Sequence, residues 1–344
     1  MGDTVLAGGS QSADAPPVPI RRLGWVDAAK GIAIVLVVFG HAWHGIRARG
    51  LIAEPLFHAV DSRIYAFHMP VFFAVSGLFL AGSVSRKLPR DFVVDRIMRL
   101  VWPMMLWTYL FLAMKLLAGD FANNTVTAAD LVRLPFPGYL HLWFLWALFL
   151  QHMALLLTRP LLKNGCYSIA VLYALAIISV VIALMPLSSG IAYWFGNAIR
   201  NAPFLVMGII IGQTRLLDRL GTGARLVAAS AFLCVIAFWP PLAGEAATRL
   251  AGSLILTFGL IAVVSGFGRS IPASAAWLVS LGSASMAIYL CHTLFSAAVR
   301  EAMLLLGVNA PGIHLVVGTL AGIVGSLVVL WLSNRIGIRK ILGF

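Results

Sequence analysis

Charged residues are scarce in this sequence. Only 11% of its 344 residues are Asp, Glu, Lys or Arg, whereas 61% are hydrophobic. A soluble domain of this size would carry a charge at about a quarter of its positions. The apolar residues also occur in long blocks rather than in amphipathic stripes. This composition excludes an ordinary soluble domain and predicts an all-α integral membrane protein.

Negative charge is the rarer of the two signs. The chain has 12 acidic residues against 25 Lys and Arg, which gives a net charge of +13. The basic residues lie in short loops between apolar blocks, and this placement argues against a nucleic-acid partner. Multi-span proteins show such a pattern because their cytoplasmic loops are enriched in Lys and Arg. The basic edge would also contact anionic membrane lipids.

Cysteine is rare as well. Cys166, Cys234 and Cys291 each lie in or beside an apolar block, and they form no CxxC pair and no metal-binding spacing. We interpret them as packing residues and expect no disulfide and no metal.

The first 20 residues contain no long apolar run and are rich in Gly, Ser, Ala and Pro, so we expect a disordered N-terminal tail at 1–20. No secretory signal is expected, because the first apolar run begins after Lys30 and no small-residue cleavage site follows it. Residues 21–344 are predicted to form one membrane domain with no appended soluble domain.

A membrane-spanning helix needs about 20 apolar residues. On this basis we expect about ten spans. Both termini are predicted to be cytoplasmic, because most Lys and Arg then fall in cytoplasmic loops. The longest loops are expected at 47–63 and 119–137, and a short interfacial helix at 271–281. The predicted spans are 28–47, 64–84, 98–118, 138–158, 167–186, 195–214, 224–242, 249–268, 280–303 and 313–334.

The first span, WVDAAKGIAIVLVVFGHAWHG, carries titratable groups at both ends. Lys30 and His41 share one helical face about 16 Å apart. Asp27 precedes Lys30 by one turn and can pair with it. Ionisable groups inside a span usually face a cavity or a partner. The purely structural alternatives are an interfacial ion pair for Asp27 and Lys30 and a helix-to-helix hydrogen bond for His41.

Other spans contribute further histidines near the outer side. His68 lies at a depth similar to that of His41, so the two could line one cavity; a hydrogen bond at the interface is the alternative. His141 and Trp143 begin the fourth span. Aromatic residues are ordinary at membrane interfaces, but sugar-binding sites also use aromatic faces.

The ninth span carries Tyr289 and His292 one turn apart. The third span begins with Arg96 and Arg99, also one turn apart and expected to point the same way. With Lys30 and neighbouring basic residues they would form a cationic cluster at the cytoplasmic edge. Such a cluster indicates either positive-inside topology and lipid contact or a phosphate-binding site, because arginine binds phosphate bidentately.

Five segments occur in order: WVDAAKGIAIVLVVFGH, FHMPVFFAVSGLFL, DRIMRLVWP, HLWFLWALF and SASMAIYLCH. Together they resemble acyltransferase family 3, the integral-membrane acyltransferases that modify surface carbohydrates, and most of all its fucose 4-O-acetylase-like branch. The resemblance covers about residues 22–335. The family has a basic residue followed by an essential histidine in its first span, which Lys30 and His41 match. The basic residue is usually arginine, so bidentate contacts are lost here. The family's paired arginines correspond to Arg96 and Arg99.

The resemblance implies transfer of an acyl group, usually acetyl, from cytoplasmic acyl-CoA to a hydroxyl of a lipid-linked or exported glycan. It implies a multi-pass protein of the bacterial inner membrane with acyl-CoA, a glycan and membrane lipids as partners. Its catalytic group would be His41, Lys30 and Asp27, and the donor would bind Lys30, Arg96 and Arg99. The residues expected to contact the acceptor are His68, His141, Trp143, Tyr289 and His292.

His41 has two possible roles in such a reaction. It could act as a general base on the sugar hydroxyl, which we favour, or it could accept the acyl group first as a covalent relay. A proton-coupled transporter or flippase is the alternative function, since intramembrane histidines can relay protons. No inverted repeat, which many transporters contain, is visible in the sequence.

Overall fold

The computed structural model describes residues 24–119, 135–239, 244–267 and 271–344. The tail predicted at 1–20 lies outside these residues. Within them every regular element is a helix, and the sole strand-like contact is an isolated bridge between Lys163 and Cys166. The prediction of an all-α protein is therefore confirmed.

Eight helical units in the described part of the chain are long and apolar enough to cross a membrane. Two of these units each consist of two consecutive helices, α2 with α3 and α4 with α5. One further unit begins with a short turn at Leu140–Leu142. The units are α1 (Gly24–Ala48), α2 (Glu54–Tyr65) with α3 (His68–Arg86), α4 (Pro89–Arg96) with α5 (Trp102–Ala118), α7 (Trp143–Leu157), α9 (Ser189–Thr214), α12 (Ala246–Ser265), α14 (Ser285–Leu305) and α15 (Pro311–Arg335).

Two further apolar helices are shorter. The fifth and seventh predicted spans correspond to α8 (Ile169–Leu184) and α10 (Thr222–Ala237), which have 16 residues each. Such a helix rises about 24 Å, less than the roughly 30 Å of a hydrocarbon core. The predicted interfacial helix corresponds to α13 (Ala276–Ser283) and the turn before it. The count of ten spans and the cytoplasmic placement of the termini remain predictions.

The prediction of a loop over 47–63 is wrong, because α2 begins at Glu54. Pro55 stands in its first turn, where a missing backbone N–H costs little. Glu54 suits the positive end of the helix and pairs with Arg47 of α1 at 2.9 Å. The segment contains too many ionisable residues for an apolar-run criterion, which is why its helix was missed.

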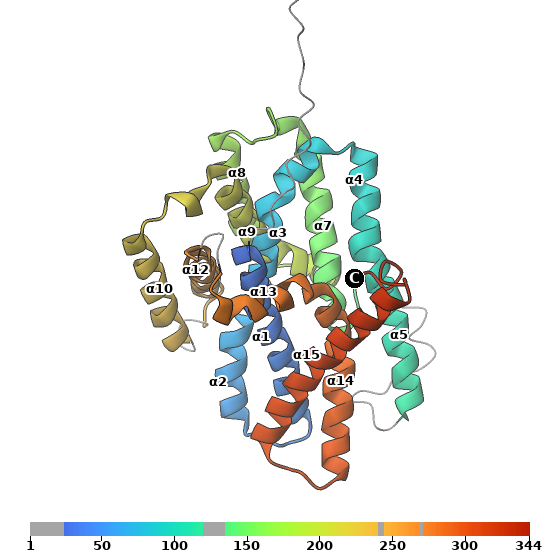
Figure 1. The fold of residues 1–344 in the computed structure, drawn as a ribbon. Coiled ribbons are helices and arrows are strands. Elements are labelled where there is room, and N and C mark those ends of the chain that lie inside the picture. Colours follow the sequence, from blue (N-terminus) through green and yellow to red (C-terminus); the bar gives the residue numbers. More distant parts are fainter. Residues whose placement is uncertain (1–23, 120–134, 240–243, 268–270) are drawn as a thin grey trace, which may run out of the picture.

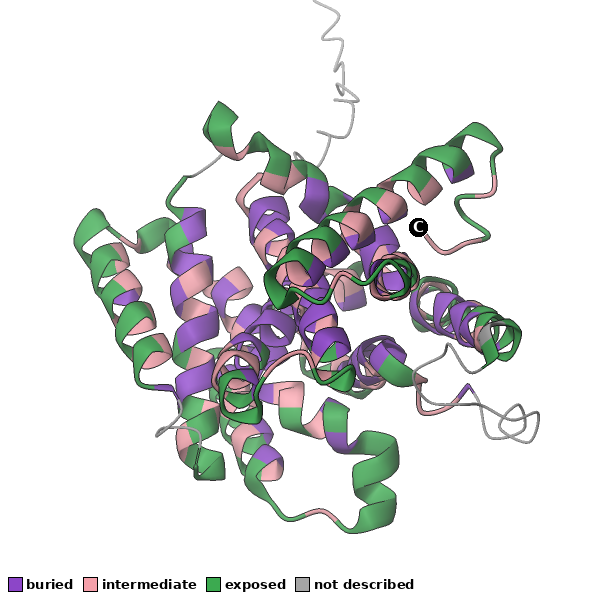
Figure 2. Cartoon of the chain, turned by 90° about the horizontal axis from the view of Figure 1, so that it is seen from below, coloured by how far each residue is buried: buried purple, intermediate pink, exposed green. Residues whose placement is uncertain are grey.

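Helix α1 occupies the middle of the bundle and contacts α2, α3, α12, α13, α14 and α15. Figure 2 shows that the buried residues concentrate in the central helices, whereas exposed residues cover the outer ones. Gly31 and Gly282 let α1 and α13 cross closely: a Cβ on Gly282 would overlap the Asp27 carbonyl oxygen. Such contacts between small residues are typical of membrane helices. They fix the part of α1 that carries Asp27 and Lys30.

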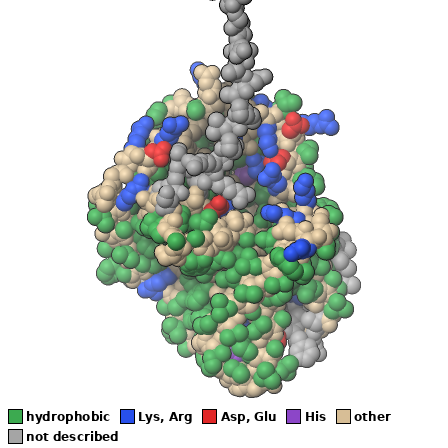
Figure 3. Space-filling model, in the orientation of Figure 1, with side chains coloured by type: hydrophobic (Ala, Val, Ile, Leu, Met, Phe, Trp, Pro, Cys, Tyr) green, Lys and Arg blue, Asp and Glu red, His purple; other side chains and the backbone are tan. Residues whose placement is uncertain are grey.

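Charged and hydrophobic side chains occupy different parts of the surface. On the face drawn in Figure 3, Lys and Arg side chains gather toward the upper end, and hydrophobic side chains cover most of the middle. The upper end is where α3 meets α4 (Figure 1). A band of apolar surface below a basic edge is what a lipid bilayer requires of its protein.

Candidate active site

Helix α1 carries the first part of the site. Lys30 Nζ lies 2.6 Å from Asp27 Oδ1, so the predicted ion pair forms. Lys30 also lines a small cavity of about 210 Å³. The other wall residues of this cavity are mostly apolar, and the polar ones are Ser76, Ser285 and Tyr289.

His41 lies further along the same helix, in contact with two other imidazoles. Its ring centroid is 5.4 Å from that of His141 and 5.0 Å from that of His292, and these two lie 5.1 Å apart. His141 comes from the Leu140–Leu142 turn before α7, and His292 comes from α14. Three elements far apart in the sequence therefore meet at one cluster of histidines.

Hydrogen bonds to the backbone hold two of these rings. His141 Nε2 lies 3.1 Å from the carbonyl oxygen of Tyr289, and the Tyr289 hydroxyl donates to the carbonyl of His141. His292 Nδ1 lies 2.8 Å from the Ile288 carbonyl oxygen, so this nitrogen must carry the proton. The Nε2 atom of neutral His292 is then an acceptor, and it is buried without a partner. His41 has no hydrogen bond to any described residue, and its ring packs against those of His141 and His292.

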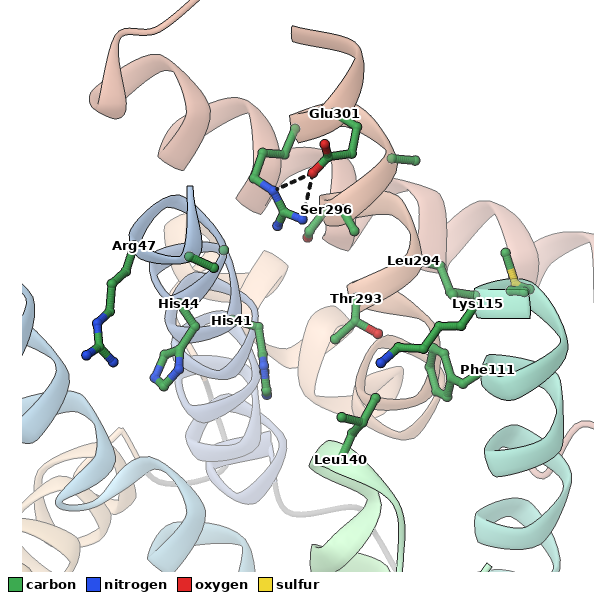
Figure 4. A pocket seen from close by; sticks show the side chains of 16 residues that line it. His41, His44, Arg47, Phe111, Lys115, Leu140, Thr293, Leu294, Ser296 and Glu301 are labelled. Carbon is green, nitrogen blue, oxygen red and sulfur yellow. Dashed lines mark hydrogen bonds and ion pairs between the residues drawn. The ribbon is translucent and has the colours of Figure 1, made fainter. Parts of the chain in front are cut away.

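His41 also faces a large cavity of about 730 Å³ between α1, α5 and α14. In Figure 4 the ring of His41 lies on the side of α1 that faces Thr293, Leu140 and Lys115, whereas the ring of His44 points to the other side. His44 is held by Asp61, with its Nε2 2.6 Å from Asp61 Oδ1. His141 and His292 are buried behind His41 and do not line the cavity. A molecule in this cavity would thus meet the His41 ring, with the other two imidazoles behind it.

The structure does not bring every predicted residue to this cavity. His68 is buried at the break between α2 and α3, where its Nδ1 lies 2.6 Å from the Ile64 carbonyl oxygen. Its ring packs against Tyr65, so His68 does not share a cavity with His41 as expected. Trp143 lines a different, smaller cleft, and Tyr289 lines the Lys30 cavity.

The predicted cationic cluster divides into two ion-pair groups. Lys30 pairs with Asp27, whereas Asp95 collects the other cations: Lys87 at 3.1 Å, Arg96 at 3.7 Å and Arg99 at 2.8 Å. The Arg96 side chain is only 17% exposed and donates to Ser83 Oγ, but that of Arg99 is 69% exposed.

Arg96 and Arg99 were expected to point the same way. The backbone between them passes into a π-helical turn over Ile97–Val101, which changes the angle between successive side chains. Both guanidinium groups still contact Asp95, but they differ in depth, and sequence spacing alone gave no sign of this turn.

Sequence reasoning missed several polar residues of the two cavities. The large cavity includes Lys115, Arg300 and Glu301, with Arg300 Nη2 3.0 Å from Glu301 Oε1. Beside the small cavity, His152 Nε2 lies 2.9 Å from Ser76 Oγ. Arg300, Glu301 and His152 all fall inside predicted spans, and an ionisable residue inside a span is itself a signal for a functional site.

No metal-binding arrangement accompanies these groups. In the described residues, no three His, Cys, Asp or Glu side chains are placed to hold a metal ion together.

Comparison with known proteins assigns this arrangement to a family. A family model described as an acyltransferase domain matches residues 23–334. Nodulation protein NolL of Sinorhizobium fredii is 35% identical over 192 residues, 55% of this chain and 48% of that protein. Its counterpart in Mesorhizobium japonicum is 31% identical over 217 residues, 62% of this chain and 54% of that protein.

The chain thus spans about half the length of the curated relatives it matches. No solved structure matches it. The family match covers α1 to α15 and includes His41, His141 and His292, and it agrees with the resemblance carried by the five sequence segments. The chain belongs to this acyltransferase family.

Proposed function

We propose that this protein transfers an acyl group, acetyl in the simplest case, from cytoplasmic acyl-CoA to a hydroxyl group of a glycan. The observation that carries the proposal is the His41 ring, which faces a cavity of about 730 Å³ and has two further imidazoles behind it. A general base needs an available nitrogen beside a space that a hydroxyl can enter. His41 meets both conditions.

In the proposed reaction a neutral His41 accepts the proton of the glycan hydroxyl. The hydroxyl oxygen forms a bond to the thioester carbonyl carbon, and the carbon–sulfur bond then breaks. The leaving thiolate takes the proton from His41, so the imidazole returns to its neutral state. An acyl-histidine relay would instead transfer the acyl group in two steps. Direct attack needs a single encounter at His41, and we favour it for that reason.

His141 and His292 act as positioning residues in this scheme. Both are buried against His41, and both are fixed by backbone carbonyl groups. The unpartnered Nε2 of His292 is a hydrogen-bond acceptor close to the His41 ring. It would stabilise the imidazolium form of His41 during transfer.

The donor would enter from the opposite side of this cluster. Lys30 and the Arg96–Arg99 pair would bind the phosphates of coenzyme A, because both groups are cationic. The small cavity beside Lys30 would accept the thin pantetheine arm. Asp27 would hold the Lys30 ammonium group in place through the ion pair at 2.6 Å.

The acceptor would enter the large cavity as part of a surface or lipid-linked glycan. The proposal includes a location in the bacterial inner membrane, with the donor on its cytoplasmic side. Family membership favours this function over a proton-coupled transporter, although contacting imidazoles would also serve a proton relay.

The test is transfer of labelled acetyl groups from acetyl-CoA to the glycan fraction of membranes that contain the His41→Ala variant. General-base catalysis contributes about 10²- to 10⁴-fold, so transfer should fall by that factor. His58→Ala is the control, because His58 is exposed, pairs with Glu54 and lies outside the cavity. Transfer near the wild-type rate by a folded His41→Ala protein would remove His41 from the mechanism.

A further inference from the structure

A second cleft lies beside the large cavity. Its volume is about 270 Å³, and it is formed where the beginnings of α7 and α9 meet. The Trp146 Nε1 atom donates to the Trp194 carbonyl oxygen at 3.0 Å and so ties the two helices together. Its wall contains one exposed amide, Asn197, and four aromatic side chains: Trp143, Trp146, Tyr193 and Trp194.

This cleft and the His41 cavity share a wall residue. Leu140 lines both of them, and the next residue is His141, whose ring contacts His41. The backbone of Leu140 has a φ of 50°, a left-handed conformation that costs an ordinary L-residue about 1–2 kcal/mol. The two spaces therefore lie on either side of a single short turn.

The chemistry of the cleft suits a sugar. Tyr and Trp rings offer a flat apolar face together with a polar group at the edge, and the C–H face of a pyranose packs on such a ring. The Asn197 amide can both donate to and accept from sugar hydroxyls. A cleft with this lining, which shares the wall residue Leu140 with the cavity in front of His41, would hold the unit next to the reacting one.

We propose that the aromatic cleft binds a second sugar unit of the acceptor while the first presents its hydroxyl to His41. The preferred acceptor is then an oligosaccharide of at least two units and not a single sugar. This inference rests on the proposed function, since it takes the large cavity as the acceptor site.

An aromatic belt at the membrane interface is the competing explanation, and the chain offers a matched pair of residues to separate the two. Trp194 and Phe195 are neighbours on α9 and are 43% and 46% exposed. Trp194 lines the cleft and Phe195 does not. A belt would use both rings, whereas a sugar-binding cleft would use only Trp194.

The experiment measures binding separately from transfer. The full-length protein, in lipid nanodiscs, is titrated with mono-, di- and trisaccharide fragments. These fragments are released by mild acid from the surface glycan of the organism that produces the protein. Binding is followed by saturation-transfer NMR for the wild type, Trp194→Ala, Phe195→Ala and His41→Ala. Transfer from acetyl-CoA is assayed in parallel.

We expect the di- and trisaccharides to bind the wild type and Phe195→Ala about three- to tenfold more tightly than the monosaccharide, the gain given by one aromatic stacking contact. Trp194→Ala should lose this gain and leave monosaccharide binding unchanged. Equal effects of the two α9 variants, or no advantage for longer fragments, would overturn the cleft proposal. Loss of binding in Trp194→Ala without any transfer by the wild type would refute the proposed function but not the cleft.

Discussion

The two cavities on either side of the histidine cluster differ in size and in chemistry. The inner one, beside Lys30, has a volume of about 210 Å³ and mostly apolar walls. The outer one, in front of His41, has about 730 Å³ and includes Lys115, Arg300 and Glu301. Tyr289 lines the inner cavity and is hydrogen-bonded to His141, which contacts His41.

Under the proposed function, this difference would let one helical bundle accept two unlike substrates. A small, nearly apolar space would suit a thin flexible arm, and a larger space with several charged groups in its wall would suit a hydrated sugar. His41 lines the larger cavity, and Tyr289 of the smaller cavity is hydrogen-bonded to His141, so the proposed reaction would occur at His41. The predictions that follow test this division of roles, from the largest expected effect to the smallest.

The largest effect after His41 itself is expected at His292. His292→Asn removes the buried acceptor nitrogen beside His41 and should lower kcat about tenfold to a hundredfold, because small misplacements of a catalytic group have costs of that order. Initial rates at saturating acetyl-CoA and acceptor would measure this change.

His314→Asn is the matched control for that variant. His314 is also buried and also bonds one carbonyl, with Nε2 2.7 Å from the Val308 oxygen and Nδ1 without a partner. It lies at the start of α15 and lines neither cavity. An equal loss of kcat in both variants would mean that His292 acts through stability rather than through His41.

Donor binding should depend on Arg96 more than on Arg99. Arg96→Gln removes a half-buried cation and should raise the KM for acetyl-CoA about tenfold. Arg99 is largely exposed, and exposed pairs contribute little, so Arg99→Gln should raise it no more than about threefold. The KM for the glycan should change in neither variant. A larger change in the KM for the glycan than in the KM for acetyl-CoA would contradict the assignment of donor and acceptor to different cavities.

Tyr289 should keep water away from the thioester. Tyr289→Ala opens the wall of the inner cavity and is expected to raise acetyl-CoA hydrolysis in the absence of acceptor about threefold to tenfold, by analogy with other sites that exclude water. Free thiol released over time measures this rate. Tyr289→Phe keeps the ring and should leave hydrolysis near the wild-type level. A rise in hydrolysis in both variants would mean that the Tyr289 ring is not what keeps water from the thioester.

The smallest effect on catalysis is expected at His68, which lies outside both cavities. His68→Ala leaves the Ile64 carbonyl without this partner and should lower the free energy of unfolding by about 1–3 kcal/mol. Thermal unfolding in detergent would show the loss, while kcat of the folded protein should stay within about twofold of wild type, as for other residues outside a site. A large fall in kcat would return His68 to the active site.

The sequence predicted the fold well where apolar runs are long. Helices such as α1 and α15 follow directly from such runs, and Asp27 pairs with Lys30 because their spacing is one helical turn. The sequence also named His41, His141 and His292, since ionisable residues are rare inside spans.

Other features depend on geometry that spacing does not encode. The break between α2 and α3 turned His68 toward a carbonyl, and the π-helical turn separated Arg96 from Arg99 in depth. Local backbone departures of this kind arise from tertiary packing, which one sequence does not display.

The central claim is that donor and acceptor reach His41 from opposite faces of the membrane. Proteoliposomes of one orientation, established by protease cleavage of an N-terminal tag, would receive acetyl-CoA on one face and the glycan fragment on the other. Transfer should occur only when acetyl-CoA is on the face that carries the tag and the glycan is on the opposite face. Transfer that requires both substrates on the same face would contradict the account.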